Sequence, residues 1–248
     1  MPTPVTPVTP VTHTPRGEFT AGLSAVLPML LGAMPFGLIY GVLAIQAGIA
    51  PLLALAIAAI VFAGSAQFML TQLAAAGTPG ALMVLAVGII NLRHALYSAA
   101  LAAPLCHLPL RWKALLAYLL TDEAYATVLR RFESDESPAT RHWYLLGAGF
   151  GLWITWQLSC AAGIVLGGQI PAAWSLDFAG TLTFIAIVVP LLRDRAVWAA
   201  MGVAGVIAVA AFALPFKLAI VAAALAGMAA GVLVEARAAP AVAARESA

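Results

Sequence analysis

A run of about 25 mostly apolar residues, from about Ala81 to Leu105, constrains the fold more than any other feature of the sequence. At about 1.5 Å per residue, a helix of this length crosses the hydrocarbon core of a bilayer, which is about 30 Å thick. The run contains Asn91, Arg93 and His94 near its middle. The sequence therefore predicts a transmembrane helix that carries a guanidinium and an imidazole deep in the membrane.

The next apolar run, over about 112–131, contains two acidic residues, Asp122 and Glu123. If the two runs form an antiparallel hairpin that turns near Leu108, Arg93 is 15 residues before the turn and Glu123 is 15 residues after it. A charge without a partner at mid-membrane costs at least about 2.5 kcal/mol. We therefore expect Arg93 to pair with Asp122 or Glu123, either as part of a functional site or as a structural ion pair that fixes helix register.

Composition extends this conclusion to the whole chain. Of the 248 residues, 63% are hydrophobic and only 9% are charged, whereas about 25% is usual in soluble domains. Cys106 lies at the end of an apolar run and Cys160 within one, so no disulfide framework is implied. The basic residues gather at the ends of the apolar runs, which is typical of membrane topology signals and not of a nucleic-acid-binding surface.

Hydropathy and helix-breaking residues predict an all-α polytopic membrane protein with about eight transmembrane helices and no strands. The transmembrane domain is expected over 19–235, between a Pro/Thr-rich disordered tail at 1–18 and a second disordered tail at 236–248. The expected spans are 20–46, 52–76, 80–105, 112–131, 143–168, 174–192, 196–214 and 216–235.

Orientation follows from the arginines and lysines. With the N-terminus inside, eight basic residues fall on the inner side and three on the outer side, which favours a cytoplasmic N-terminus. The inner group is Arg16, Arg130, Arg131, Arg141, Arg193, Arg195, Arg237 and Arg245, and the outer group is Arg111, Lys113 and Lys217. If the fourth segment did not span the membrane, every later segment would be inverted.

Two short patterns suggest an internal duplication of four plus four spans, with halves at about 20–131 and 143–235. Phe36-Gly37-Leu38 recurs as Phe150-Gly151-Leu152, and residues 62–68 resemble residues 178–184, at offsets of 114 and 116. Transporters built from repeats often bind substrate at the repeat interface. Chance similarity in alanine-rich apolar sequence is the alternative.

The first predicted span contains Pro35 and Gly37 within Gly32-Ala33-Met34-Pro35-Phe36-Gly37. Because proline lacks an amide donor and glycine is a poor helix former, the helix is expected to be kinked or broken here. The ends of a broken helix could then bind an anionic substrate. A tight helix-packing face made of small residues is the alternative.

The second predicted span carries Gly64, Ser65 and Gln67, which place a hydroxyl and an amide at membrane depth. These groups could contact substrate or hold helices together by interhelical hydrogen bonds. In the third span, His94 could carry a proton near neutral pH or serve as a hydrogen-bonded structural residue.

The sequence contains no pattern typical of an enzyme. We find no phosphate-binding glycine loop with a lysine, no histidine pair at metal-ligand spacing and no nucleophile elbow. We therefore predict neither an enzyme nor a cofactor, and we do not expect ATP bound to this chain to drive transport.

Taken together, the motifs resemble the AzlC family, the large subunit of bacterial branched-chain amino-acid exporters. The resemblance covers roughly residues 20–235. The segments that carry it are Pro35-Phe36-Gly37, Phe62-Ala63-Gly64-Ser65-Ala66-Gln67-Phe68, Asn91-Leu92-Arg93-His94-Ala95-Leu96-Tyr97-Ser98 and Thr121-Asp122-Glu123-Ala124-Tyr125-Ala126.

This resemblance implies an inner-membrane secondary exporter of branched-chain or similar small apolar amino acids, working with a small membrane subunit of the AzlD type. Proton coupling is an inference from the titratable groups in the spans, not from the resemblance. Site candidates at the matching positions are Asn91, Arg93, His94, Asp122 and Glu123. The rival interpretation is a structural membrane scaffold whose buried ion pair is architectural and whose partner carries the transport pathway.

Overall fold

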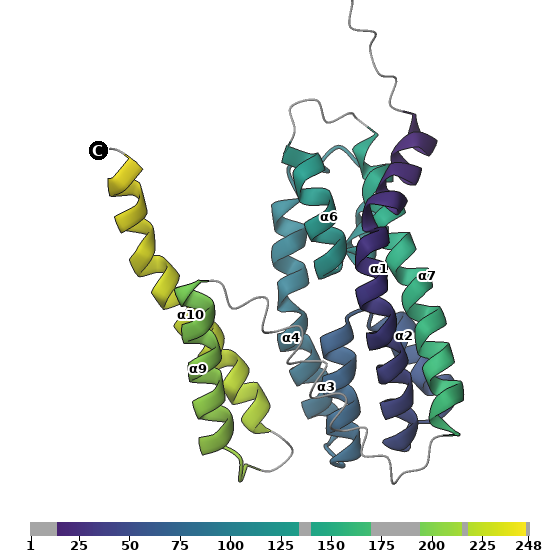
Figure 1. The fold of residues 1–248 in the computed structure, drawn as a ribbon, viewed down its shortest axis with the longest axis vertical. Helices are drawn as coiled ribbons and strands as arrows, with labels where there is room; N and C mark the ends of the chain where they lie inside the picture. The colour runs from purple at the N-terminus through teal and green to yellow at the C-terminus, as the bar shows by residue number, and fades with distance from the viewer. Residues whose placement is uncertain (1–13, 134–139, 170–193, 215–217, 247–248) are drawn as a thin grey trace, which may run out of the picture. The chain divides into compact units, whose positions relative to one another are not determined.

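The computed structural model describes residues 14–133, 140–169, 194–214 and 218–246, and over these residues the chain is all-helical with no strand (Figure 1). The predicted sixth span, 174–192, lies outside this part. The helices are α1 (Pro15–Gln46), α2 (Pro51–Ile60), α3 (Gly64–Ala75), α4 (Gly80–Ala100), α5 (Leu110–Leu119), α6 (Asp122–Glu133), α7 (Arg141–Gly167), α9 (Arg195–Ala210) and α10 (Leu218–Glu246).

Three helices among the described residues, α1, α4 and α7, are long and apolar enough to cross a membrane. In such helices every backbone polar group is bonded within the segment, as a lipid environment requires. The long predicted spans one, three and five are therefore present as helices.

Helix α1 begins earlier than predicted and is not broken at Pro35. Thr14 accepts a hydrogen bond from the Gly17 amide through Oγ1 at 3.1 Å, and Pro15 occupies the first helical position, where its missing amide proton costs nothing. The helix thus starts inside the predicted tail 1–18. Pro35 lies within the continuous helix, so the expected break in the first span is wrong; packing against neighbouring helices lets membrane helices contain proline.

The contacts divide the chain into two units, and each is described by itself. The first unit comprises Met1–Pro35 and Arg93–Leu158, and the second comprises Phe36–Leu92 and Ser159–Ala248. The division falls within α1, α4 and α7.

In each unit α1 packs against α7 through glycines. In the first unit a Cβ on Gly22 would collide with the backbone of Tyr144, and one on Gly147 would collide with the carbonyl of Phe19. In the second unit a Cβ on Gly41 would collide with the carbonyl of Cys160, and one on Gly163 would collide with the carbonyl of Leu38. Close backbone contact of this kind is the role that small residues play between membrane helices.

The predicted second span is broken into α2 and α3. The amide Nε2 of Gln67 donates to the carbonyl of Val61 at 2.5 Å and to that of Ala58 at 3.4 Å, although Ala58 is nine residues earlier. In a continuous helix, nine residues would separate the two positions by about 13 Å. The chain therefore turns back at Val61–Ala63 and forms a hairpin of two short helices, the α2–α3 hairpin (Figure 1).

The predicted fourth span is also broken, into α5 and α6. The ring of Trp112, near the start of α5, is 4.9 Å from that of Trp143 at the start of α7. Near the end of α6, the guanidinium of Arg131 is 6.0 Å from the ring of Tyr144. The α5–α6 hairpin therefore enters and leaves at the end of the first unit where α7 begins. Its tip lies deeper along α7, since Leu119 packs against Gly149.

These contacts correct the predicted topology of the first unit. Arg141 Nη2 donates to the carbonyl of Pro104 at 3.0 Å, so the turn after α4 lies at the same end as the start of α7. We had expected these segments on opposite sides. Hydropathy counts 112–131 as one span, but α5 and α6 are only about 15 and 18 Å long. The structure does not confirm eight full-length spans, and the four-plus-four duplication, which depends on residues 178–184, stays a prediction.

Helices α9 and α10 pack against each other in the second unit, with Gly227 facing the carbonyl of Ala200. The Asp194 carboxylate caps α9 by accepting a hydrogen bond from the Val197 amide at 2.8 Å. Helix α10 continues to Glu246, so the predicted disordered tail at 236–248 is wrong over most of its length. The reason is the alanine-rich sequence of this segment, since alanine has the highest helix propensity.

Candidate functional site

The tip of the α5–α6 hairpin places two carboxylates at a chain reversal. Thr121 caps α6 through Oγ1, which accepts a hydrogen bond from the Ala124 amide at 3.3 Å. Asp122 and Glu123 follow in the first turn. Acidic side chains are favourable at a helix N-terminus because the helix dipole is positive there. The local sequence Thr-Asp-Glu therefore both starts α6 and presents its acids at the tip.

Arg93 of α4 meets this tip. Its Nη1 atom is 2.5 Å from Oδ2 of Asp122, so the predicted ion pair is present and its acid is Asp122. The side chains are 30% and 40% exposed, respectively. The two charges lie at one level, as the hairpin argument predicted, and the pair is open enough to meet a ligand.

Tyr97, one helical turn after Arg93, bonds the other carboxylate oxygen. Its hydroxyl donates to Oδ1 of Asp122 at 2.7 Å, and its ring stacks on that of Tyr125 at a centroid distance of 4.6 Å. Asp122 therefore has a separate partner for each oxygen. Tyr97 was not predicted as a site residue, although its spacing of four from Arg93 places both side chains on one face of α4.

Three other predicted residues belong to the first unit. His94 is half-buried, and its ring lies 6.1 Å from that of Tyr97. Glu123 is also half-buried, next to Asp122. Pro35 is exposed on α1. A role for His94 or Glu123 as a proton carrier stays a prediction.

The remaining predicted residues belong to the second unit. Gly64 and Ser65 begin α3 at the tip of the α2–α3 hairpin, and Gln67 is fully buried there, with its amide bonded to the reversed backbone. A contact between Gln67 and substrate therefore stays a prediction. Gly37 is buried in α1, and Asn91 is half-buried on α4, two residues before Arg93.

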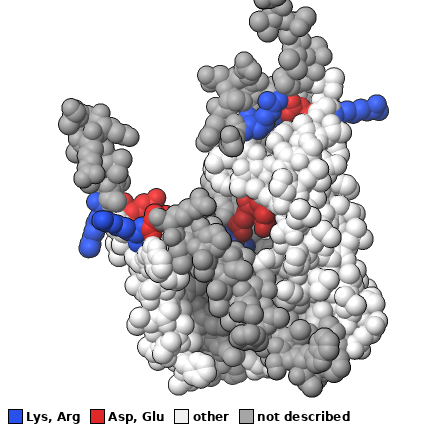
Figure 2. All heavy atoms as spheres, in the orientation of Figure 1, with Lys and Arg blue, Asp and Glu red and all other residues white. Residues whose placement is uncertain are grey.

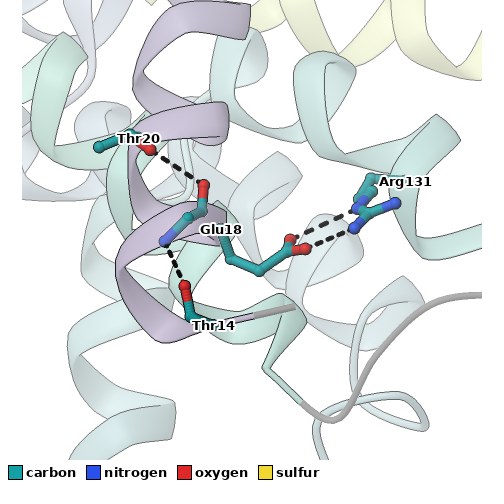
Figure 3. Close-up of polar contacts among 5 residues, drawn as sticks. Thr14, Glu18, Thr20 and Arg131 are labelled. Carbon is teal, nitrogen blue, oxygen red and sulfur yellow. Dashed lines mark hydrogen bonds and ion pairs between the residues drawn. The ribbon is translucent and has the colours of Figure 1, made fainter. Parts of the chain in front are cut away.

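A second ion pair was not predicted. Glu18 of α1 is only 3% exposed, and Arg131 of α6 binds it with two nitrogens: Nη2 is 2.5 Å from Oε1, and Nε is 3.4 Å from Oε2 (Figure 3). From the sequence, Arg131 was expected only as one of the basic residues on the inner side, with no partner predicted. Glu18 precedes the predicted first span, so hydropathy gave no signal for a buried acid there.

Figure 2 shows few charged atoms among mostly uncharged ones on the face that it draws. No group of three or more histidines, cysteines or acids that could hold a metal ion occurs in the described part of the chain. The chemistry available at the tip is ionic: a guanidinium that can exchange a carboxylate partner for another anionic group.

The comparisons with known proteins agree with the sequence motifs. The AzlC family model, described as AzlC protein, matches residues 28–170. The chain belongs to the AzlC family. The matched AzlC segment includes Arg93, Tyr97 and Asp122, both hairpins and all of α7.

Among relatives of this AzlC protein, an uncharacterized membrane protein of Archaeoglobus fulgidus is 30% identical over 214 residues, covering 84% of this chain and 92% of the relative. The inner membrane protein YgaZ of Escherichia coli K12 is 28% identical over 153 residues, covering 61% of this chain and 62% of YgaZ. No solved structure matches the chain. The protein is thus an AzlC-family membrane protein, and this is consistent with a role related to membrane transport.

Proposed function

We propose that this protein is a secondary active exporter of branched-chain or similar small apolar amino acids. The observation that carries the proposal is the Arg93–Asp122 ion pair, 2.5 Å long and partly exposed, at the tip of a hairpin of two short helices. Charged residues within membrane segments commonly mark substrate or ion pathways.

In the proposed cycle Arg93 binds the substrate carboxylate. A guanidinium matches a carboxylate with two parallel hydrogen bonds, which a lysine ammonium does not reproduce. When Asp122 takes up a proton, its attraction for Arg93 falls, and Arg93 becomes available to the substrate. Glu123, adjacent to Asp122, offers a second proton acceptor. Export is therefore coupled to protons, and apolar residues of the neighbouring helices accept the branched side chain.

We also propose a multi-pass protein in the bacterial inner membrane with a cytoplasmic N-terminus. The segments of the first unit near the starts of α1 and α7 carry many basic residues, whereas the connection 47–50 that follows the other end of α1 carries none. This asymmetry between the two ends of α1 supports a cytoplasmic location for the end where α1 begins. The basic residues of these segments are Arg16, Arg111, Lys113, Arg130, Arg131 and Arg141.

A small membrane subunit of the AzlD type is part of the proposal. The side chains of Leu92 and Leu96 on α4 are 60% and 70% exposed and flank Arg93 in the sequence. Such an apolar surface has to be covered by lipid or by another membrane protein.

The experiment that tests export measures intracellular valine, leucine, isoleucine and methionine after cells are fed dipeptides, with and without this chain and the small subunit. We expect lower pools in cells that contain both.

Arg93→Lys should lose most of the export, about tenfold or more, since a charge-assisted hydrogen bond contributes about 1.5–3 kcal/mol. Arg111→Lys, at an exposed position, is the matched control. Equal export by Arg93→Lys and the parent, at equal protein level, would refute the binding role.

The second candidate function is a scaffold subunit in which the ion pair only holds α4 and α6 together. The exchange variant Arg93→Asp with Asp122→Arg separates the two proposals because it keeps the pair but moves the guanidinium to α6. The scaffold proposal predicts normal assembly and normal export through the partner. The exporter proposal predicts normal assembly without export.

A further inference from the structure

Helix α6 is held by an ion pair at each end, and the two pairs lead to different helices. At its first residue, Asp122 pairs with Arg93 of α4; near its last, Arg131 pairs with Glu18 of α1. Between them, the Thr127 hydroxyl lies 3.3 Å from the sulfur of Met29 on α1. Together with its buried apolar residues, these two charged contacts connect α6 to two different helices of the first unit.

The chain next to α6 permits it to move. The helical hydrogen-bond ladder is interrupted at Leu120 and Thr121, where the Leu120 amide bonds Ala117 and the Thr121 amide bonds Leu119. Because α5 and α6 are not one continuous helix, α6 can change its angle at this point without breaking α5. Movement of packed helices about such points is a common form of conformational switching.

The Glu18–Arg131 pair joins a buried acid to a partly exposed base. Glu18 is almost completely buried, and both of its oxygens face Arg131. Buried ion pairs add little net stability, because desolvation of the charges offsets their attraction, but they select one arrangement over others. Arg131 is 26% exposed, so water reaches the cationic side of the pair, and a displacement of α6 from α1 would expose Glu18 as well.

We propose that the Glu18–Arg131 pair is a lock that holds α6 against α1. The lock closes the first unit at the end where α1 begins, and it lies at the opposite end of α6 from the Arg93–Asp122 pair. Opening the lock lets α6 turn about Leu120–Thr121 and exposes the surface between α6 and α1. The link to transport rests on the proposed export function. The lock itself does not, since it can be tested without substrate.

The test uses a cysteine reporter at Thr127, which is half-buried between α6 and α1, in a full-length chain in which the exposed Cys106 is replaced by serine. A membrane-impermeant maleimide is applied to intact cells and to inside-out vesicles. The chain without the reporter measures labelling of the buried Cys160. Glu235→Gln, at an exposed position of α10, is the matched charge control.

The double variant Glu18→Gln with Arg131→Gln removes the lock without leaving one buried charge alone. We expect labelling of the reporter to rise at least fivefold on one membrane face. The exchange variant Glu18→Arg with Arg131→Glu should return labelling to the parent rate.

The lock is refuted if the double variant labels at the parent rate. It is also refuted if the double variant fails to accumulate while the exchange variant accumulates, because the pair is then only structural. Failure of export would leave the labelling result intact, so the two proposals fail separately.

Discussion

The two hairpins of short helices solve the same backbone problem with different side chains. Helices α2 and α5 start 59 residues apart and α3 and α6 start 58 apart, and each hairpin follows a long helix. In the α2–α3 hairpin the buried amide of Gln67 bonds the carbonyls of the reversed chain. In the α5–α6 hairpin Thr121 caps the second helix, and the acid beside it bonds α4.

The two hairpin tips therefore use their polar groups for different purposes. The neutral tip uses its polar atoms to satisfy its own backbone, as any chain reversal in lipid requires. The charged tip satisfies its backbone with a hydroxyl and keeps a carboxylate for a group outside the hairpin. We therefore expect changes at the charged tip to affect export and changes at the neutral tip to affect stability.

The largest effect is expected for Asp122→Asn, which keeps the size of the side chain but removes its charge and its proton site. Export from dipeptide-fed cells should fall about 100-fold, equivalent to about 2.7 kcal/mol. Thermal unfolding in detergent should change much less. Export that matched the Glu235→Gln control would show that Asp122 is not part of the transport step.

Gln67→Met should lower the stability of the protein and leave export nearly unchanged. Methionine has a similar length but no amide, so the hydrogen bonds from Nε2 to the carbonyls of Val61 and Ala58 are lost, at about 1 kcal/mol each. We expect a lower free energy of unfolding in denaturant titrations, with export per folded molecule close to that of the parent. A stable variant that no longer exports would place Gln67 on the substrate path and end the contrast between the two tips.

Tyr97→Phe tests whether the second contact to Asp122 matters. The variant keeps the ring stacked on Tyr125 and removes only the hydroxyl that bonds Oδ1. Since a hydrogen bond to a charged group contributes about 1.5 kcal/mol or more, export should fall about tenfold. Tyr125→Phe is the control, because it retains the stack and touches no atom of Asp122 in the contacts described above. An equal loss in both variants would show that the hydrogen bond from Tyr97 to Asp122 is not the cause.

The smallest effect is expected for Thr121→Ala, which removes the cap of α6. Loss of an N-cap costs about 1 kcal/mol, and Thr121→Ser should restore it. The measurement is the free energy of unfolding, with export unchanged after correction for folded protein. If serine failed to restore stability, the methyl group and not the hydroxyl would hold the tip.

The sequence was sufficient to predict the long helices and a pairing of Arg93 with Asp122 or Glu123, because these predictions depend on a sustained apolar run and an uncompensated charge; the structure selects Asp122. It was not sufficient to predict the hairpins. Their breaks, at Val61–Ala63 and Leu120–Thr121, contain no glycine or proline, and a hydropathy window averages across them. They exist because tertiary partners such as Gln67 and Gly149 complete the reversed chain. Proline, the strongest local breaker, lies instead within an unbroken α1.

The shortness of α5 and α6 has a consequence for the synthesis of the protein. A segment of 10 or 12 residues is too short for stable insertion by itself and marginal as an isolated helix. The α5–α6 segment has to wait for α7 to leave the ribosome, since Tyr118 and Leu119 contact Trp153 and Gly149. A nascent chain that ends before Trp153 lacks these contacts, so we expect α5 and α6 to reach their final position only after α7 has been made.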